Sequence, residues 1–134
     1  MARIRLAAKR ENLVKFLDVI SNFAERNQFP ADVVIKINLS IEEALVNILN
    51  FAYPEHDGEI EICYRKEEDT KLIIEILDNG IPFDPLSLPE PNFSEKLSNR
   101  RIGGLGVYFI RKIPADVRYH RESDANILTL IFSK

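Results

Sequence analysis

The longest regular pattern in the chain runs from residue 30 to residue 54 and reads PADVVIKINLSIEEALVNILNFAYP. Its apolar residues recur three and four positions apart, which is the spacing of one face of an α-helix. Pro30 and Pro54 bracket the pattern, because proline is tolerated at a helix start but cannot continue a helix. The apolar positions cover much of the circumference, so we expect a helix that lies deep in the fold. They are Val33, Val34, Ile37, Ile41, Ala44, Leu45, Ile48 and Leu49.

Four polar residues interrupt this apolar helix along one line. Ser40, Glu43, Asn47 and Asn50 stand at positions i, i+3, i+7 and i+10, so they share one side of the helix. A carboxylate that borders a core needs a partner or a ligand, because burying an unpaired charge is costly. Two interpretations stay open: the amides bond to the backbone of a neighbouring loop, or Glu43 and Asn47 face a bound ligand.

The rest of the chain predicts two further helices and five strands. Residues 13–24 carry a second helical pattern, with Asn12 as its candidate cap, and a short helix at 107–113 ends before Pro114. Strands are expected at residues 3–8, 59–64, 72–77, 115–121 and 127–132, with turns at 65–69 and 122–126. This order predicts one α+β domain over residues 1–134, a two-layer sandwich of a mostly antiparallel mixed sheet with helices on one face.

Composition limits what the protein can do. The chain has 134 residues, 46% of them hydrophobic, and a net charge of −3 from 18 Lys+Arg and 21 Asp+Glu. These numbers predict a core without disulfides, and mixed charges with no basic block argue against DNA or RNA binding. No apolar run has the length of a membrane span or a secretory signal. One cysteine and two histidines are too few for a disulfide or a Cys/His zinc site, which is typical of the cytoplasm.

Two segments with glycines follow the first predicted hairpin. Asp78-Asn79-Gly80 comes directly after a strand, and it is either a simple turn or a ligand contact. Residues 78–99 contain too many prolines for regular structure, and a loop of this length is typical of a lid or a binding loop. A glycine cluster then opens the short helix, where free N–H groups either bind phosphate or form a flexible connection. Its members are Gly103, Gly104 and Gly106.

Taken in order, these motifs resemble the GHKL ATPase superfamily, and most of all the bacterial anti-sigma-factor serine/threonine protein kinases. The N-box is written here as Glu42-Glu43-Ala44-Leu45-Val46-Asn47. The first glycine box is Asp78-Asn79-Gly80-Ile81-Pro82-Phe83-Asp84-Pro85, and the second is Gly103-Gly104-Leu105-Gly106-Val107. The resemblance covers nearly the whole chain and implies the Bergerat-type, histidine-kinase-like ATP-binding fold.

The resemblance also implies a role for each matched residue. Asp78 would accept a hydrogen bond from the adenine amine, Gly80 would leave room for the purine, and Asn47 would bind Mg²⁺ between the phosphates. Glu43 would be the general base that takes the proton from an attacking hydroxyl. One of two adjacent arginines would contact the γ-phosphate, and a solvated basic pair is the alternative. The further ATP contacts implied are Arg100, Arg101, Gly103, Gly104, Leu105, Gly106 and, through its hydroxyl, Thr129.

Two positions depart from the family pattern. Pro82 stands where many members carry a second glycine, a substitution that is frequent in the anti-sigma branch. Phe51 stands where some anti-sigma kinases carry a histidine, which leaves the contact of that histidine in doubt.

The function implied by the resemblance is ATP- and Mg²⁺-dependent phosphorylation of a serine or threonine on an anti-sigma-factor antagonist. The same protein would serve as an anti-sigma factor in a partner-switching system, with a sigma factor and a second copy of the chain as further candidate partners. The alternative is a non-catalytic nucleotide-binding switch that sequesters a regulatory partner. Glu43 favours the enzyme, because a pure binder has no need of a carboxylate beside the γ-phosphate.

Overall fold

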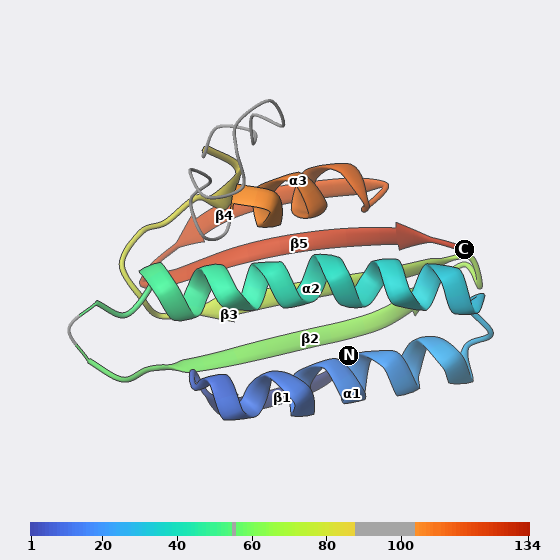
Figure 1. The fold of residues 1–134 in the computed structure, drawn as a ribbon, viewed down its shortest axis with the longest axis horizontal. Helices are drawn as coiled ribbons and strands as arrows, with labels where there is room; N and C mark the ends of the chain where they lie inside the picture. The colour runs from blue at the N-terminus through green and yellow to red at the C-terminus, as the bar shows by residue number, and fades with distance from the viewer. Residues whose placement is uncertain (55, 88–103) are drawn as a thin grey trace.

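The computed structural model describes residues 1–54, 56–87 and 104–134. In this part of the chain, five strands form one sheet and three α-helices cover one of its faces (Figure 1), so the predicted α+β two-layer arrangement is confirmed. The strands are β1 (Ala2–Ala7), β2 (Glu59–Glu67), β3 (Lys71–Asp78), β4 (Asp116–Glu122) and β5 (Ala125–Ser133). The helices are α1 (Leu13–Arg26), α2 (Ala31–Phe51) and α3 (Gly104–Lys112), and the short 3-10 helices are η1 (Arg10–Asn12) and η2 (Pro85–Ser87).

The β3 strand occupies the centre of the sheet. The strand order is β1-β2-β3-β5-β4, and every pairing among the described strands is antiparallel. Alternate residues of β3 point toward the helices, and the apolar ones are almost fully buried. Asp78 continues this inward row, because it follows Leu72, Ile74 and Ile76 at intervals of two. A carboxylate therefore ends a row of core side chains.

The α2 helix lies across the sheet between α1 and α3, as its wide apolar face predicts (Figure 1). Its side chains interlock with those of α1 and of the strands in one core. The largest fully buried side chains include Phe16, Ile20, Ile37, Ile41, Leu45, Ile62, Ile74 and Leu130. None of the helices that the structure describes is long and apolar enough to cross a membrane.

Two local expectations from the sequence are wrong. Asn12 precedes α1, but its side chain does not cap the helix, because its Nδ2 donates instead to the carbonyl oxygen of Ala7 at 2.8 Å. The turn between β2 and β3 is shorter than the charge pattern indicates, because strand pairing continues to Glu67. Glu68, Asp69 and Thr70 reverse the chain there, and the first two have left-handed φ angles of 55° and 58°.

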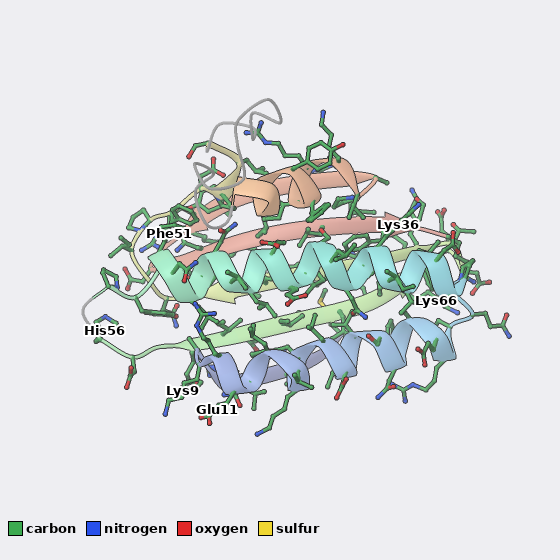
Figure 2. All side chains as sticks on the ribbon, viewed as in Figure 1. Lys9, Glu11, Lys36, Phe51, His56 and Lys66 are labelled. Carbon is green, nitrogen blue, oxygen red and sulfur yellow. The ribbon has the colours of Figure 1, made fainter. Side chains whose placement is uncertain are left out.

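The C-terminal ends of α2 and β3 lie at the same end of the molecule. Figure 2 shows Phe51 and His56 at this end, and Lys36 and Lys66 at the other. The loop that leaves β3 is bonded to the last turn of α2, since the N–H of Ile81 donates to the carbonyl oxygen of Ala52 at 2.9 Å. The N-box helix and the first glycine box are thereby brought into direct contact.

Candidate functional site

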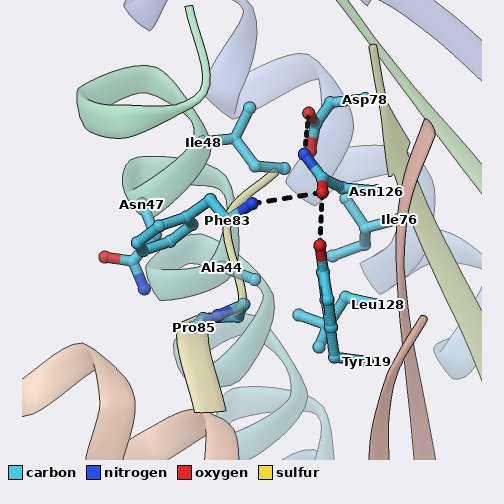
Figure 3. A pocket seen from close by; sticks show the side chains of 10 residues that line it. All are labelled: Ala44, Asn47, Ile48, Ile76, Asp78, Phe83, Pro85, Tyr119, Asn126 and Leu128. Atoms are coloured by element: carbon cyan, nitrogen blue, oxygen red, sulfur yellow. Dashed lines mark hydrogen bonds between the residues drawn. The ribbon is translucent and has the colours of Figure 1, made fainter. Parts of the chain in front are cut away.

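A pocket lies between the end of α2 and the neighbouring ends of β3 and β5 (Figure 3). Its walls are mostly apolar, and a few polar groups come from α2 and three different strands. The lining residues are Ala44, Asn47, Ile48, Ile76, Asp78, Phe83, Pro85, Tyr119, Asn126 and Leu128. Apolar walls with a small number of polar groups are typical of small-molecule sites. The structure thus brings Asn47 and Asp78, which are 31 positions apart in the sequence, to one pocket.

Asp78 supplies the negative charge of this pocket. The side chain is 5% exposed, and its Oδ1 accepts hydrogen bonds from the N–H of Gly80 at 2.9 Å and from Asn126 Nδ2 at 2.8 Å. Burial raises the pKa of Asp78, and these two bonds and the charge of Arg121 oppose that rise. Both bonds end on one oxygen, so the carboxylate keeps acceptor capacity for a donor on a ligand.

Asn126 is the site residue that the sequence reasoning missed, because it was placed in the turn before the last strand. The structure starts β5 at Ala125 and pairs Asn126 directly with Asp78 across the sheet. Its side chain is buried, at 4% exposure. The available signal was the period of two, because the inward positions Leu128, Leu130 and Phe132 continue backward to 126.

Gly80 is required by backbone packing. A Cβ built on this residue would lie 2.2 Å from the carbonyl oxygen of Ala52, a distance that real Cβ atoms do not show. Arg121 Nη1 fixes the same residue from the other side, by donating to the carbonyl oxygen of Gly80 at 2.8 Å. The direction in which a side chain of residue 80 would point is therefore filled by the backbone of Ala52.

Tyr53 holds the glycine box from the side of β2. Its hydroxyl donates to the carbonyl oxygen of Glu59 at 2.6 Å and accepts from the N–H of Asn79 at 2.8 Å. Burial raises the pKa of Tyr53, so the hydroxyl keeps its proton and can act as donor and acceptor at once. The turn that carries Asp78 is thus tied to three separate segments of the chain.

The polar stripe on α2 divides into buried and exposed positions. Ser40 is fully buried and Asn47 is 1% exposed, whereas Glu43 is half-buried and Asn50 is exposed. Neither amide atom of Asn47 has a hydrogen-bond partner among the described residues. The described residues thus show no bond from this amide to a neighbouring loop. A buried amide without a partner indicates a missing ligand or water. Burial, and next the adjacent Glu42, raises the pKa of Glu43.

Thr129 is not part of the pocket. It lies in β5 between the buried Leu128 and Leu130, so its side chain points to the face of the sheet that the helices leave open. The prediction that Thr129 contacts adenine is therefore not supported by the geometry. Asn126 is the residue of β5 that reaches Asp78.

The second glycine box is described in part. The α3 helix begins at Gly104 and includes Leu105 and Gly106, which agrees with the prediction that this box opens a helix. Three other predicted phosphate contacts lie outside the described residues, namely Arg100, Arg101 and Gly103. Most of the proline-rich segment that we expected to form a lid also lies outside them.

The pocket is nearly closed in this structure. The cavity between its walls has a volume of about 20 Å³, counted as the space that the centre of a water molecule can reach. A single water molecule needs roughly 10–15 Å³ by this measure. Phe83 and Pro85, from the segment after β3, form one wall of the pocket (Figure 3). A purine would enter only after this wall moves.

Comparison with known proteins identifies the class. The family model of the histidine kinase-like ATPase domain matches residues 6–132. The chain therefore belongs to this family, as the three sequence boxes indicate.

Curated relatives place the chain beside a particular group of kinases. A serine-protein kinase RsbW of Bacillus cereus (strain AH187) is 29% identical over 129 residues, which are 93% of this chain and 80% of the relative. A serine-protein kinase RsbW of Listeria innocua is 28% identical over 130 residues, with 93% and 82% covered.

A solved structure agrees on the fold. The histidine kinase domain of the blue-light-activated histidine kinase from Erythrobacter litoralis EL346 superimposes with a TM-score of 0.56 at 17% identity. The superposition covers 90% of this chain and 60% of that one.

Proposed function

We propose that the protein is an ATP-dependent serine/threonine protein kinase that phosphorylates an anti-sigma-factor antagonist and also acts as an anti-sigma factor. The similarity to serine-protein kinases RsbW over 93% of the chain supports this class of activity. The observation that carries the proposal is the pocket that joins Asp78 to an orphaned Asn47, with Glu43 one helical turn from Asn47.

The base of ATP would be recognised by Asp78. Its carboxylate is buried and already held through one oxygen, so a purine amine can donate to the other oxygen without a change in the orientation of the carboxylate. The phosphates would lie toward the start of α3, because the first N–H groups of a helix and its dipole favour anions. Gly103, Gly104, Leu105 and Gly106 would form that end, with Arg100 or Arg101 on the γ-phosphate.

Asn47 would hold Mg²⁺. The fit rests on its buried amide, whose oxygen has no partner among the described residues and is a neutral ligand of the kind that this hard cation accepts. When bound there, Mg²⁺ would supply charge neutralisation for the transferred phosphoryl group. The amide would set the position of the ion on α2, while the phosphates and waters complete its coordination.

Glu43 would act as the general base. It would take the proton of a serine or threonine hydroxyl while that oxygen bonds to the γ-phosphorus, and the bond from phosphorus to the β–γ bridging oxygen breaks to release ADP. Its half-buried position raises its pKa, which makes the carboxylate a better proton acceptor than an exposed one. Glu42 is the natural comparison, because it is adjacent in sequence and exposed.

The test is single-turnover transfer from labelled ATP to antagonist-type proteins of the same genome. Glu43→Gln keeps the size of the side chain but cannot accept the proton, so transfer should fall roughly 10²-fold or more while ATP affinity holds or improves. Glu42→Gln should transfer at the wild-type rate. Equal rates for wild type and Glu43→Gln would remove Glu43 as the base. ATP binding without transfer to any candidate would favour the nucleotide-dependent switch that sequesters its partner.

The partners proposed follow the same class. We expect the antagonist as phosphate acceptor, a sigma factor as a second ligand, and a second copy of the chain as a candidate subunit. Neither a nucleic acid nor a membrane is needed for this activity. The cytoplasm is the compartment that suits it, because the sequence has one cysteine, Cys63, and no second thiol to pair with it.

A further inference from the structure

Asn126 is an unusual residue for its place in the fold. It occupies an inward position of β5, where the following inward residues are Leu128, Leu130 and Phe132. A polar side chain in such a row costs free energy unless its hydrogen-bonding groups are matched. The amide of Asn126 donates two hydrogen bonds and accepts two, so all its hydrogen-bonding groups are matched. The partners of these bonds indicate its role.

The two donor positions of Asn126 connect the pocket carboxylate to the loop that follows it. Nδ2 donates to Asp78 Oδ1 at 2.8 Å and to the carbonyl oxygen of Ile81 at 2.8 Å. Asp78 Oδ1 therefore accepts two hydrogen bonds, one from Asn126 and one from the N–H of Gly80. Among the described residues no hydrogen bond to Asp78 ends on Oδ2, so this oxygen can accept one from a ligand.

The acceptor side of Asn126 faces the outer wall of the pocket. Oδ1 accepts from the hydroxyl of Tyr119 at 2.5 Å and from the N–H of Phe83 at 3.3 Å (Figure 3). These partners fix which end of the amide is which, because a flipped amide would set nitrogen against an N–H and oxygen against a carboxylate. Tyr119, Asn126 and Asp78 thus form one chain of hydrogen bonds from the edge strand β4 to the centre of the sheet.

We propose that Asn126 is the positioning residue for purine recognition: through its bond to Oδ1 it presents the other oxygen of Asp78 to the exocyclic amine, and Tyr119 orients Asn126. This inference rests on the proposed ATP-binding function. Asn126 does not contact the base itself, because both of its donors and its acceptor are engaged within the protein. Specificity for an amino-purine then depends on a residue of the last strand that is not Thr129.

The contribution of Asn126 should appear in the pH dependence of nucleotide binding, because several charged groups surround Asp78. Arg121 favours the ionised carboxyl from β4, and Tyr53 faces it from the segment after α2. On the open face of the sheet, Arg5, Glu59 and Glu61 line a small polar hollow with Asp78. A donated hydrogen bond stabilises the carboxylate, so losing the Asn126 amide moves the protonation of Asp78 to higher pH. Binding that needs the carboxylate would then fail earlier as pH falls.

The experiment compares ATP with inosine triphosphate, which has a carbonyl in place of the amine. Calorimetric titrations with Mg²⁺ between pH 5 and 8 would use wild type and three variants. Asn126→Leu removes the amide at similar size, Asn126→Thr restores one donor, and Thr129→Val changes the opposite face of the same strand. We expect Asn126→Leu to lose about tenfold or more of its ATP affinity, most of its preference for ATP over inosine triphosphate, and part of its acid-side binding range.

The other variants separate positioning from folding. Asn126→Thr should recover part of the ATP preference, and Thr129→Val should match wild type in affinity, preference and pH profile. Circular dichroism reports whether Asn126→Leu is folded. If it is not, Tyr119→Phe carries the test, since loss of that hydroxyl should shift the pH profile in the same direction by a smaller amount.

Two results would overturn the inference, and they are distinguishable. Wild-type preference and pH profile in folded Asn126→Leu, or in Tyr119→Phe where that variant carries the test, would show that the hydrogen-bond chain does not position Asp78, while the ATP-binding function stands. Failure of the wild-type protein to bind either nucleotide would overturn the proposed function, and this inference with it.

Discussion

The ring of Phe51 stacks on the ring of Phe83, with centroids 5.1 Å apart and planes inclined by 30°. Phe51 is the last residue of α2 and is 41% exposed, while Phe83 comes from the loop after β3 and lines the pocket. The position where some relatives are expected to carry histidine therefore has a structural partner in this chain. The stack holds the closing wall of the pocket against the N-box helix.

Removing this stack should make the pocket easier to open. An offset aromatic pair contributes about 0.5–1.5 kcal/mol beyond its buried area, and that free energy opposes any ligand that must displace Phe83. Phe51→Ala should therefore raise ATP affinity by about two- to tenfold in a calorimetric titration. Ile35→Ala, which removes an apolar and more exposed side chain earlier in α2, should leave the affinity unchanged. A loss of affinity in Phe51→Ala would mean that the stack supports the base instead of blocking it.

Asp78→Asn should weaken ATP binding while it stabilises the protein without ligand. The purine amine loses a charged acceptor, and a hydrogen bond to a charged group is worth about 1.5–3 kcal/mol, or about tenfold or more in affinity. The amide oxygen can still accept the bonds from Gly80 and Asn126, while the cost of burying a carboxylate disappears. Calorimetry measures the affinity, and thermal unfolding without nucleotide measures the stability.

The sign of the pH dependence follows from the raised pKa of Asp78. Because the folded-state pKa lies above the unfolded one, the protonated carboxyl favours folding, and that contribution is lost as pH rises through the folded-state pKa. The stability advantage of Asp78→Asn should thus be largest near neutral pH and shrink toward pH 4. Identical melting temperatures of the two proteins at every pH would contradict a buried, ionised carboxyl.

Asn47→Ala should remove the Mg²⁺ dependence of nucleotide binding without the usual cost of changing a buried residue. The Asn47 amide makes no hydrogen bond with the described residues, so its removal loses no protein contact of that kind. Affinity for ATP should become the same with and without Mg²⁺, and the unfolding midpoint in urea should stay close to wild type. Asn50→Ala, on the exposed part of the same stripe, should keep the wild-type response to the metal. Full Mg²⁺ dependence in Asn47→Ala would place the ion elsewhere.

Gly80→Ala should destabilise the fold by about 1–3 kcal/mol or more, because the added methyl group meets the backbone of Ala52, which cannot rotate away. Gly58→Ala is the matched comparison. Its Cβ would meet the ring of Tyr53, a side chain that can rotate away but only by giving up its hydrogen bonds to Glu59 and Asn79. The loss of stability should therefore be smaller than for Gly80→Ala but still measurable. Urea unfolding measures both changes, and equal losses would show that the loop after β3 adjusts as freely as a side chain.

Local periodicity was enough to predict the helices and strands. A residue's place on a helix or a strand depends on neighbours two to four positions away, so the sequence carries it directly. The burial of Ile37, Ile41 and Leu45 on α2 followed from their spacing alone. The N-box and glycine boxes likewise identified the family, because their residues are contiguous in the chain.

Contacts between distant segments were decided only by the tertiary structure. Whether Asn126 or Thr129 reaches Asp78 depends on where β5 begins and on its register with β3, and a shift in that boundary moves a residue from a turn into the core. The need for glycine at position 80 came from the carbonyl of Ala52, which belongs to another element. The same holds for the orphaned amide of Asn47, since a sequence shows that a helix position is polar but not whether the folded chain supplies its partner.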